Sequence, residues 1–208
     1  MSILYLARHG ETDLNDYNRR AEDQMLGGQL NVQLNPRGRR QGDELGHLFL
    51  ARGVTFDAAW SSDLDRCVET AERIVAPQPH VVPATDPRLR ERSLGAFEGK
   101  TVSQIRMLFP EYASGDKADF RASYEHRAPG GEHYGDVEER MTAAIAEFEE
   151  GEGNILVVSH KHAIRAWLRK ALGLSRPQAL SLSIPNARPI VLAKEETYRL
   201  IEGLDLPI

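Results

Sequence analysis

Two histidines in this sequence each follow a run of apolar residues. The first run, Ile3 to Ala7, leads into Arg8 and His9, and the second, Ile155 to Val158, leads through a serine into His160. An imidazole can act as a nucleophile or as a base, and the planar guanidinium of arginine binds anions through paired donors. An arginine next to a histidine therefore indicates an anion held beside a nucleophile or a base.

The elements that must position these histidines are two buried strands. Each apolar run is bounded by polar residues, as expected of a strand that is buried on both faces of a sheet. His9 and His160 then lie at carboxyl ends of strands, the edge where α/β sheets bind their ligands. Gly10, directly after the first histidine, lets the backbone turn and a ligand approach closely.

Four motifs, taken in order, resemble those of the histidine phosphatase superfamily, which includes phosphoglycerate mutases, fructose bisphosphatases and many small phosphatases. The resemblance extends from residue 3 to about residue 190. The motifs are Arg8-His9-Gly10-Glu11-Thr12 with Asn15; Ser61-Ser62-Asp63-Leu64 with Arg66 and Thr70; Leu89-Arg90-Glu91 with Gly95 and Glu98-Gly99; and Val158-Ser159-His160 with Ile164-Arg165.

The resemblance implies a phosphatase that needs neither a metal nor a cofactor. His9 would attack phosphorus and form a phosphohistidine, and Glu91 would protonate the leaving oxygen and then activate water. Glu98 and Glu11 lie in the same motifs and are alternatives for the acid. The resemblance also implies that the two strands are parallel neighbours, so that His9 and His160 converge. The phosphate would be bound by Arg8, Asn15, Arg66 and His160.

Length and composition fit one globular domain that spans residues 1–208. The chain is 41% hydrophobic and 27% charged, with a net charge of −5 that argues against a nucleic-acid partner. No leader peptide or membrane-spanning run is apparent, so we expect a cytoplasmic protein with a phosphorylated small-molecule substrate and no membrane partner. A homodimer is possible. The single cysteine, Cys67, excludes an intrachain disulfide and a cysteine-based zinc site.

Strands that alternate with helices predict an α/β fold, a three-layer α/β/α sandwich around a mostly parallel sheet. The polar stretches 10–35 and 110–134 are expected to be loops, with a possible lid within 100–135. The expected helices run from Asn35-Pro36 to Gly53, from a cap at Asp63 to Pro77, from a Thr101–Gln104 capping box to before Pro110, along Val137 to Phe148, and from His160 to Gly173. The expected strands are 58–61, 81–82 and 155–159, followed by a hairpin of 190–192 and 198–201.

This chain departs from the pattern of the family near the second histidine. Lys161 and His162 stand where many family phosphatases have glycines, and Arg188 stands where a small residue is frequent. We hypothesise that these three residues recognise a second acidic group on the substrate. Gly28 is a further candidate for substrate binding.

Other functions are also compatible with these residues. His160-Lys161-His162, with His9, could ligate a transition metal in a metal-dependent hydrolase. Cys67 and Arg73 have the spacing of a cysteine phosphatase, but the segment has helical periodicity and no glycine, which favours a core cysteine. A phosphoglycerate mutase is the main alternative, although the stretch between Glu91 and His160 is shorter than in those enzymes. A phospholigand-binding protein without turnover is another.

Overall fold

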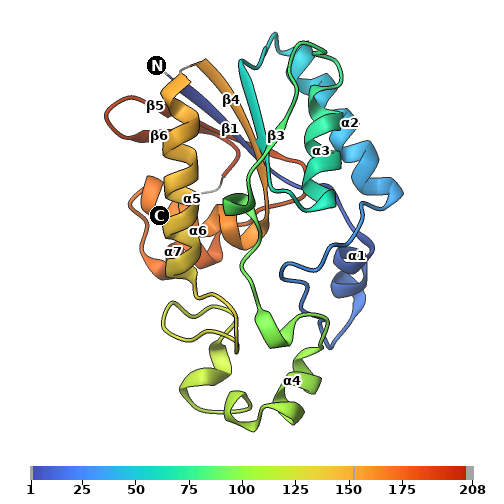
Figure 1. Cartoon of the computed structure of the whole chain (residues 1–208), viewed down its shortest axis with the longest axis vertical. Coiled ribbons are helices and arrows are strands. Elements are labelled where there is room, and N and C mark those ends of the chain that lie inside the picture. Colours follow the sequence, from blue (N-terminus) through green and yellow to red (C-terminus); the bar gives the residue numbers. More distant parts are fainter. Residues whose placement is uncertain (1, 152, 205–208) are drawn as a thin grey trace.

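A six-stranded sheet forms the centre of the computed structural model, which describes residues 2–151 and 153–204 (Figure 1). The strand order is β3-β2-β4-β1-β5-β6. Strands β1 to β4 pair in parallel, whereas β5 and β6 are antiparallel additions at one side. The strands are β1 (Ser2–Arg8), β2 (Ala58–Ser61), β3 (Ala84–Thr85), β4 (Gly153–Ser159), β5 (Pro189–Lys194) and β6 (Tyr198–Glu202).

Helices cover both faces of this sheet, and the side chains of β1 alternate between the two faces. Leu4 and Leu6 pack in one core cluster with α5 (Tyr134–Phe148) and α6 (Lys161–Ala171). Tyr5 and Ala7 pack in a second cluster with α2 (Pro36–Ala51) and α3 (Asp65–Val75). Each fully buried leucine contributes about 1.5–3 kcal/mol to stability. The predicted three-layer α/β/α fold is confirmed.

A third, smaller cluster lies away from the sheet, at the lower end of the molecule in Figure 1. It is formed around Phe97 by residues from the segment 94–128 and by Leu26. The segment contains α4 (Val102–Leu108) and several 3-10 turns, and the remaining helices of the described chain are α1 (Asp13–Arg20) and α7 (Arg176–Ser181). The 3-10 turns are Pro87–Leu89, Gly95–Phe97, Pro110–Tyr112, Asp116–Asp119 and Glu149–Gly151.

Several predicted boundaries are confirmed by capping contacts. The Asn35 side chain accepts a hydrogen bond from the Gly38 N–H at the start of α2, as predicted from Asn35-Pro36. Thr101 and Gln104 form the predicted capping box of α4. Strand β4 and the β5–β6 hairpin also lie where the sequence predicts them.

Two helices were missed by the sequence interpretation because they lack an apolar stripe. The predicted loop 10–35 contains α1, in which no residue is buried. Thr12 caps this helix, and Asn15, at its third position, completes a capping box with an amide where glutamate or glutamine is usual. Helix α7, capped by Ser175, is similarly short.

Two further predictions were wrong in their details. Asp63 does not cap α3, which begins at Asp65 without a side-chain cap; the Asp63 carboxylate instead accepts hydrogen bonds from Arg90 at 2.7 and 2.5 Å. The third strand is not 81–82 but β3, whose Ala84 and Thr85 pair with β2. Val82 precedes a proline and is 83% exposed, so it contributes nothing to the core.

The backbone after β1 lies in close contact with α2. A Cβ placed on Gly10 would lie 2.4 Å from the Gly38 carbonyl oxygen, so glycine is required for this approach. The Gly10 N–H donates to the Thr70 hydroxyl of α3 at 2.9 Å. The first histidine is thereby held between the sheet and two helices.

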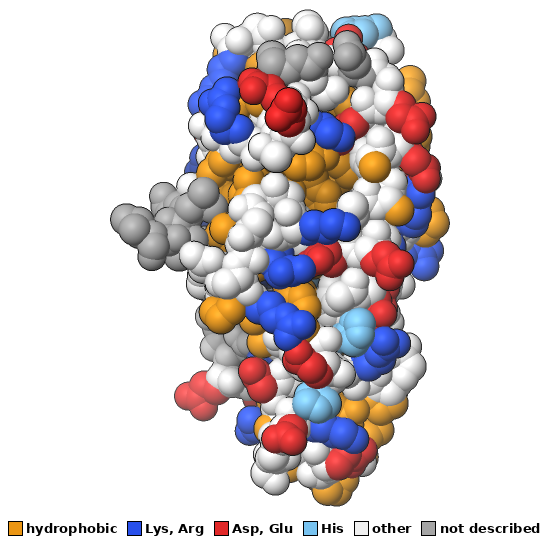
Figure 2. All heavy atoms as spheres, turned by 90° about the vertical axis from the view of Figure 1, so that its left-hand side faces the viewer, with side chains coloured by type: hydrophobic (Ala, Val, Ile, Leu, Met, Phe, Trp, Pro, Cys, Tyr) orange, Lys and Arg blue, Asp and Glu red, His pale blue; other side chains and the backbone are white. Residues whose placement is uncertain are grey.

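The exterior has a mixed charge. On the face seen in Figure 2, acidic and basic side chains are interspersed with hydrophobic ones. Among residues 2–151 and 153–204, no helix has both the length and the apolar character needed to cross a bilayer.

Candidate active site

The two histidines meet at the carboxyl edge of the sheet. Arg8 of β1 is in register with Ser159 of β4, and the His9 N–H donates to the Ser159 carbonyl at 3.0 Å. The ring centroids of His9 and His160 are 5.2 Å apart. The expected convergence of the two strand ends is confirmed, because β1 and β4 are parallel neighbours.

The His9 ring is held in one orientation by its own backbone. Its Nδ1 lies 2.7 Å from the Gly10 carbonyl oxygen, which can only accept, so Nδ1 carries the proton and Nε2 keeps its lone pair. Burial lowers the pKa of His9 well below its usual value, and the nearby Arg8 and Arg66 lower it further. The ring is therefore a neutral imidazole with a free Nε2.

We expect His9 to remain neutral when the pH is lowered through the usual histidine pKa of about 6.5. A lowered pKa means that the proton binds only at lower pH. The ¹⁵N shifts of labelled histidine rings, with His9 assigned through His9→Ala, would measure this. Titration of His9 near pH 6.5 would contradict the expectation.

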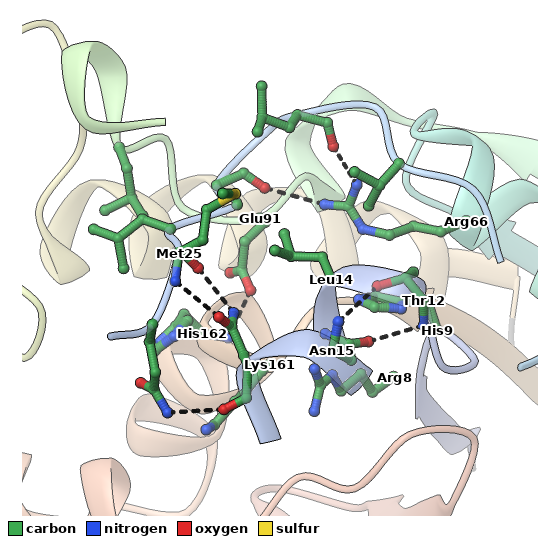
Figure 3. Close-up of a pocket in the computed structure, with 18 of the residues that line it drawn as sticks. Arg8, His9, Thr12, Leu14, Asn15, Met25, Arg66, Glu91, Lys161 and His162 are labelled. Atoms are coloured by element: carbon green, nitrogen blue, oxygen red, sulfur yellow. Dashed lines mark hydrogen bonds between the residues drawn. The ribbon is translucent and has the colours of Figure 1, made fainter. Parts of the chain in front are cut away.

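Arg8 and Arg66 bring two guanidinium groups to the cavity (Figure 3). Arg8 donates to the Ile184 carbonyl at 3.1 Å, but its buried Nε has no partner in the described chain. Burial lowers the pKa of Arg8 to about 10, since the cation has lost much of its hydration. Arg66 donates to the carbonyls of Leu30 at 2.6 Å and Gly28 at 3.1 Å, so it also fixes the loop that borders the cavity.

Asn15 lies in the same cavity because α1 begins there. Its Oδ1 accepts hydrogen bonds from the Thr12 N–H and from Asn186 Nδ2, at 3.2 and 3.3 Å. Both acceptor contacts are on the oxygen, so the amide nitrogen remains available as a neutral donor. Gly28 also borders the cavity, with its carbonyl oxygen engaged by Arg66.

Glu91 lines the cavity and contacts the first turn of α6. Its two carboxylate oxygens accept hydrogen bonds from the backbone N–H groups of Ala163 at 3.1 Å and His162 at 3.3 Å, and Oε1 accepts one from Arg92 at 2.9 Å. Arg140 of α5 binds the backbone carbonyl of Glu91 at 3.0 Å and those of residues 88 and 90. Glu91 is thus held at its carboxylate by backbone N–H groups and at its own backbone by Arg140.

The two alternative acids have other partners. The Glu11 carboxylate borders the cavity, but it pairs with Arg19 at 2.6 Å and with Arg37 at 3.5 Å. Glu98 Oε1 accepts hydrogen bonds from the backbone N–H groups of Gln29 at 3.0 Å and Leu94 at 2.9 Å. Glu98 is not among the residues that line the cavity, and Glu11 is paired with arginines, which leaves Glu91 as the candidate acid.

His160 lies next to His9 and is fully buried, and it is not among the residues that line the cavity. Its Nε2 is 3.3 Å from the Cys67 sulfur, and burial, followed by Arg66 and His9, lowers its pKa well below the usual value. Cys67 itself is buried in the cluster between the sheet and α2–α3, and burial raises the pKa of its thiol strongly. A buried, protonated thiol is not a nucleophile, which agrees with the core role predicted for Cys67.

The three residues proposed to recognise a second acidic group are not brought together. Lys161 borders the cavity, and so does His162, whose Nδ1 makes a very short hydrogen bond with the Tyr134 hydroxyl. Arg188 borders a different cavity, next to Arg37 and α2.

Two arginines that the sequence interpretation did not assign as site residues contribute to the first cavity. Arg92 and Arg121 line this space of about 340 Å³. Both belong to polar stretches without periodicity, in which residue type and spacing do not distinguish a surface arginine from a site arginine. The position of Arg92 directly after Glu91 was the one available signal.

No three histidine, cysteine, aspartate or glutamate side chains are grouped as metal ligands within the part of the chain that the structure describes. His162 is oriented toward Tyr134, and His160 toward Cys67. The two histidines of the His160-Lys161-His162 motif therefore have different partners.

Comparison with known proteins identifies the class to which this fold and site belong. The model of the histidine phosphatase superfamily (branch 1) matches residues 4–204, and the chain belongs to this family. It is 31% identical over 176 residues to a broad-specificity phosphatase from Saccharomyces cerevisiae. The aligned region covers 80% of this chain and 70% of the yeast protein.

Two further relatives match most of this chain, but they differ in how much of their own length is matched. The human 6-phosphofructo-2-kinase/fructose-2,6-bisphosphatase 1 is 30% identical over 183 residues, which are 88% of this chain but 35% of that enzyme. The structure of a mycobacterial glucosyl-3-phosphoglycerate phosphatase with VO3 superposes with a TM-score of 0.80 at 28% identity, covering 99% and 98% of the two chains. The relatives of this chain thus include phosphatases of different named substrates.

Proposed function

We propose that this protein is a phosphomonoesterase that works through a phosphohistidine on His9, with Glu91 as general acid and base. The observation that carries the proposal is the His9 ring, neutral and with Nε2 free, in a cavity lined by arginines. The membership in a family with phosphatase relatives supports it. Neutral imidazole attacks phosphorus without needing to lose a proton first.

In the first step, His9 Nε2 forms a bond to phosphorus while the ester P–O bond breaks. The leaving oxygen takes its electron pair and receives the proton of a protonated Glu91. In the second step, the Glu91 carboxylate removes a proton from water as the water oxygen bonds to phosphorus and the P–N bond breaks. Inorganic phosphate, neutral His9 and protonated Glu91 result, so each group returns to its starting state.

The arginines supply the electrostatic part of the catalysis. Arg8 and Arg66 would bind the non-bridging oxygens, whose charge must be stabilised throughout the transfer. Asn15 would add a neutral donor, and His160, whose ring lies next to that of His9, would add another. Phosphate bound to these residues compensates for the hydration that burial has removed from Arg8.

Glu91→Gln tests the general acid. With an alkyl phosphate, whose leaving group needs a proton, we expect kcat/KM to fall by about 10²–10³-fold. With 4-nitrophenyl phosphate, whose leaving group departs as a stable anion, the loss should be at most roughly tenfold. The exposed Glu139→Gln is the matched control. Equal losses with both substrates would contradict the acid role and indicate that Glu91 only supports the site.

The same assay separates the proposed phosphatase from its alternatives. Measurement of inorganic phosphate against phosphoryl transfer to a second substrate carbon, with phosphoglycerate present, distinguishes hydrolysis from mutase activity. A chelator arm tests the metal-dependent alternative. Binding of phosphorylated ligands without any turnover would identify a phospholigand-binding protein.

A further inference from the structure

The cavity holds more positive charge than the transfer of one phosphoryl group requires. Two of its cations, Arg8 and Arg66, are assigned to the phosphoryl oxygens. Arg19 is neutralised by Glu11, and Glu91 is engaged by backbone N–H groups. The basic side chains that line the cavity are Arg8, Arg19, Arg66, Arg92, Arg121 and Lys161.

Lys161 is the least satisfied of these cations. It is the first residue of α6 and is partly buried, yet its ammonium has no hydrogen bond or ion pair with any residue of 2–151 and 153–204. In Figure 3 it lies on the side of Glu91 and His162, across the cavity from His9 and Arg66. A partly buried ammonium without a partner costs free energy that a bound anion would recover.

The charges that surround Lys161 come from several elements. Burial lowers its pKa to about 8, and Arg165 of α6, Arg8 of β1 and Arg121 lower it as well, whereas Glu91 opposes them. The cations predominate, so the surroundings of Lys161 have a positive potential. A ligand with negative charge on this side of the cavity would be stabilised by all of them.

Arg121 belongs to the segment that follows α4, and its backbone is anchored beside the cavity. The Arg92 guanidinium donates to the carbonyls of Phe120 at 3.2 Å and Arg121 at 2.8 Å. One Arg121 nitrogen donates to Gln24 Oε1 at 2.8 Å, and in the described chain its guanidinium has no carboxylate partner. Arg121 thus offers free donors on the same cavity as Lys161.

We propose that the cavity accepts phosphomonoesters that carry a second anionic group, and that Lys161, together with Arg121, binds that group. This inference rests on the proposed function, because it takes His9, Arg8 and Arg66 as the phosphoryl site. It replaces the trio expected from the sequence: Arg188 lines another cavity, and His162, whose pKa burial lowers well below its usual value, is a neutral partner of Tyr134.

The test uses pairs of substrates that differ by one anionic group. The first pair is 3-phosphoglycerate and glycerol 1-phosphate, and the second is fructose 1,6-bisphosphate and fructose 6-phosphate. We expect wild type to prefer the member with the second anion in at least one pair by about tenfold or more, the effect of a charge-assisted hydrogen bond. The preferred pair reveals whether the second group is a carboxylate or a phosphate.

Lys161→Met should remove most of that preference by raising KM for the doubly anionic member, while activity on the other member stays within about twofold. Arg121→Gln should reduce the preference less, since it is exposed. Lys170→Met, at the exposed end of the same helix, is the matched control and should retain the preference. Absence of any preference in wild type, or equal losses on both members in Lys161→Met, would overturn the proposal.

Calorimetric binding to the His9→Ala protein separates this proposal from the proposed function. Suppose that wild type hydrolyses no phosphomonoester, that His9→Ala binds a doubly anionic ligand more tightly than the singly anionic member of its pair, and that adding Lys161→Met abolishes this preference. The second-anion site would then stand, and the proposed phosphatase activity would fail. If neither protein binds with a preference, the second-anion site fails.

Discussion

Replacing His9 by alanine should lower kcat/KM for phosphomonoesters by at least about 10³-fold, as expected when a nucleophile is removed. The cavity and its arginines would remain, but the neutral imidazole that attacks phosphorus would be gone. Rapid quenching of wild type with ³²P-labelled substrate should trap a label that is stable to alkali and labile to acid, as a phosphohistidine is.

The control is His47→Ala, which removes an exposed histidine of α2. It should retain full activity and full labelling, whereas His9→Ala should not be labelled. Activity of His9→Ala within tenfold of wild type, or label that persists in it, would contradict the role of His9 as nucleophile.

Arg66→Lys should reduce kcat/KM by about 10²–10³-fold although the positive charge is retained. The guanidinium reaches two carbonyls of the loop 28–30 and still presents donors to the cavity, which an ammonium with one nitrogen cannot do. Steady-state kinetics and the inhibition constant of inorganic phosphate measure the effect. We expect kcat/KM to fall and the inhibition constant to rise.

Arg106→Lys, at an exposed position of α4, is the control for this substitution and should behave as wild type. Thermal unfolding of Arg66→Lys shows whether the loss of the loop contacts also unfolds the protein. A folded Arg66→Lys with less than a fivefold loss of kcat/KM would show that charge alone suffices at this position.

The parts of the fold that the sequence predicts are those with a strong hydrophobic pattern. β1 and β4 are buried on both faces, so their apolar runs and the histidines at their ends are recognisable without a structure. α1 is not, because it buries no residue and exists through its capping box. The position of α1 depends on tertiary contacts. Asn15 could be assigned to the site only through the family resemblance.

The arginines of the site show a different limit of prediction from the sequence. Arg66 could be assigned because it stands in a recognisable motif, whereas Arg92 and Arg121 stand in polar segments without periodicity. Arg92 donates to the backbone carbonyls of Phe120 and Arg121, and Arg121 donates to Gln24; such contacts cannot be read from residue type or spacing. Arg188 shows the converse: a residue can stand near site residues in the sequence and line another cavity.

The position of β1 in the sheet has a consequence for how the protein is made. β1 is synthesised before its neighbours on both sides, β4 and β5, which begin at Gly153 and Pro189. At translation rates of about 5–20 residues per second, this apolar strand waits roughly 7 to 30 s for its first partner. The nascent chain therefore carries an unpaired central strand while the residues between β1 and β4 are made, which makes it a candidate for chaperone binding. The two histidines meet only after β4 has been made.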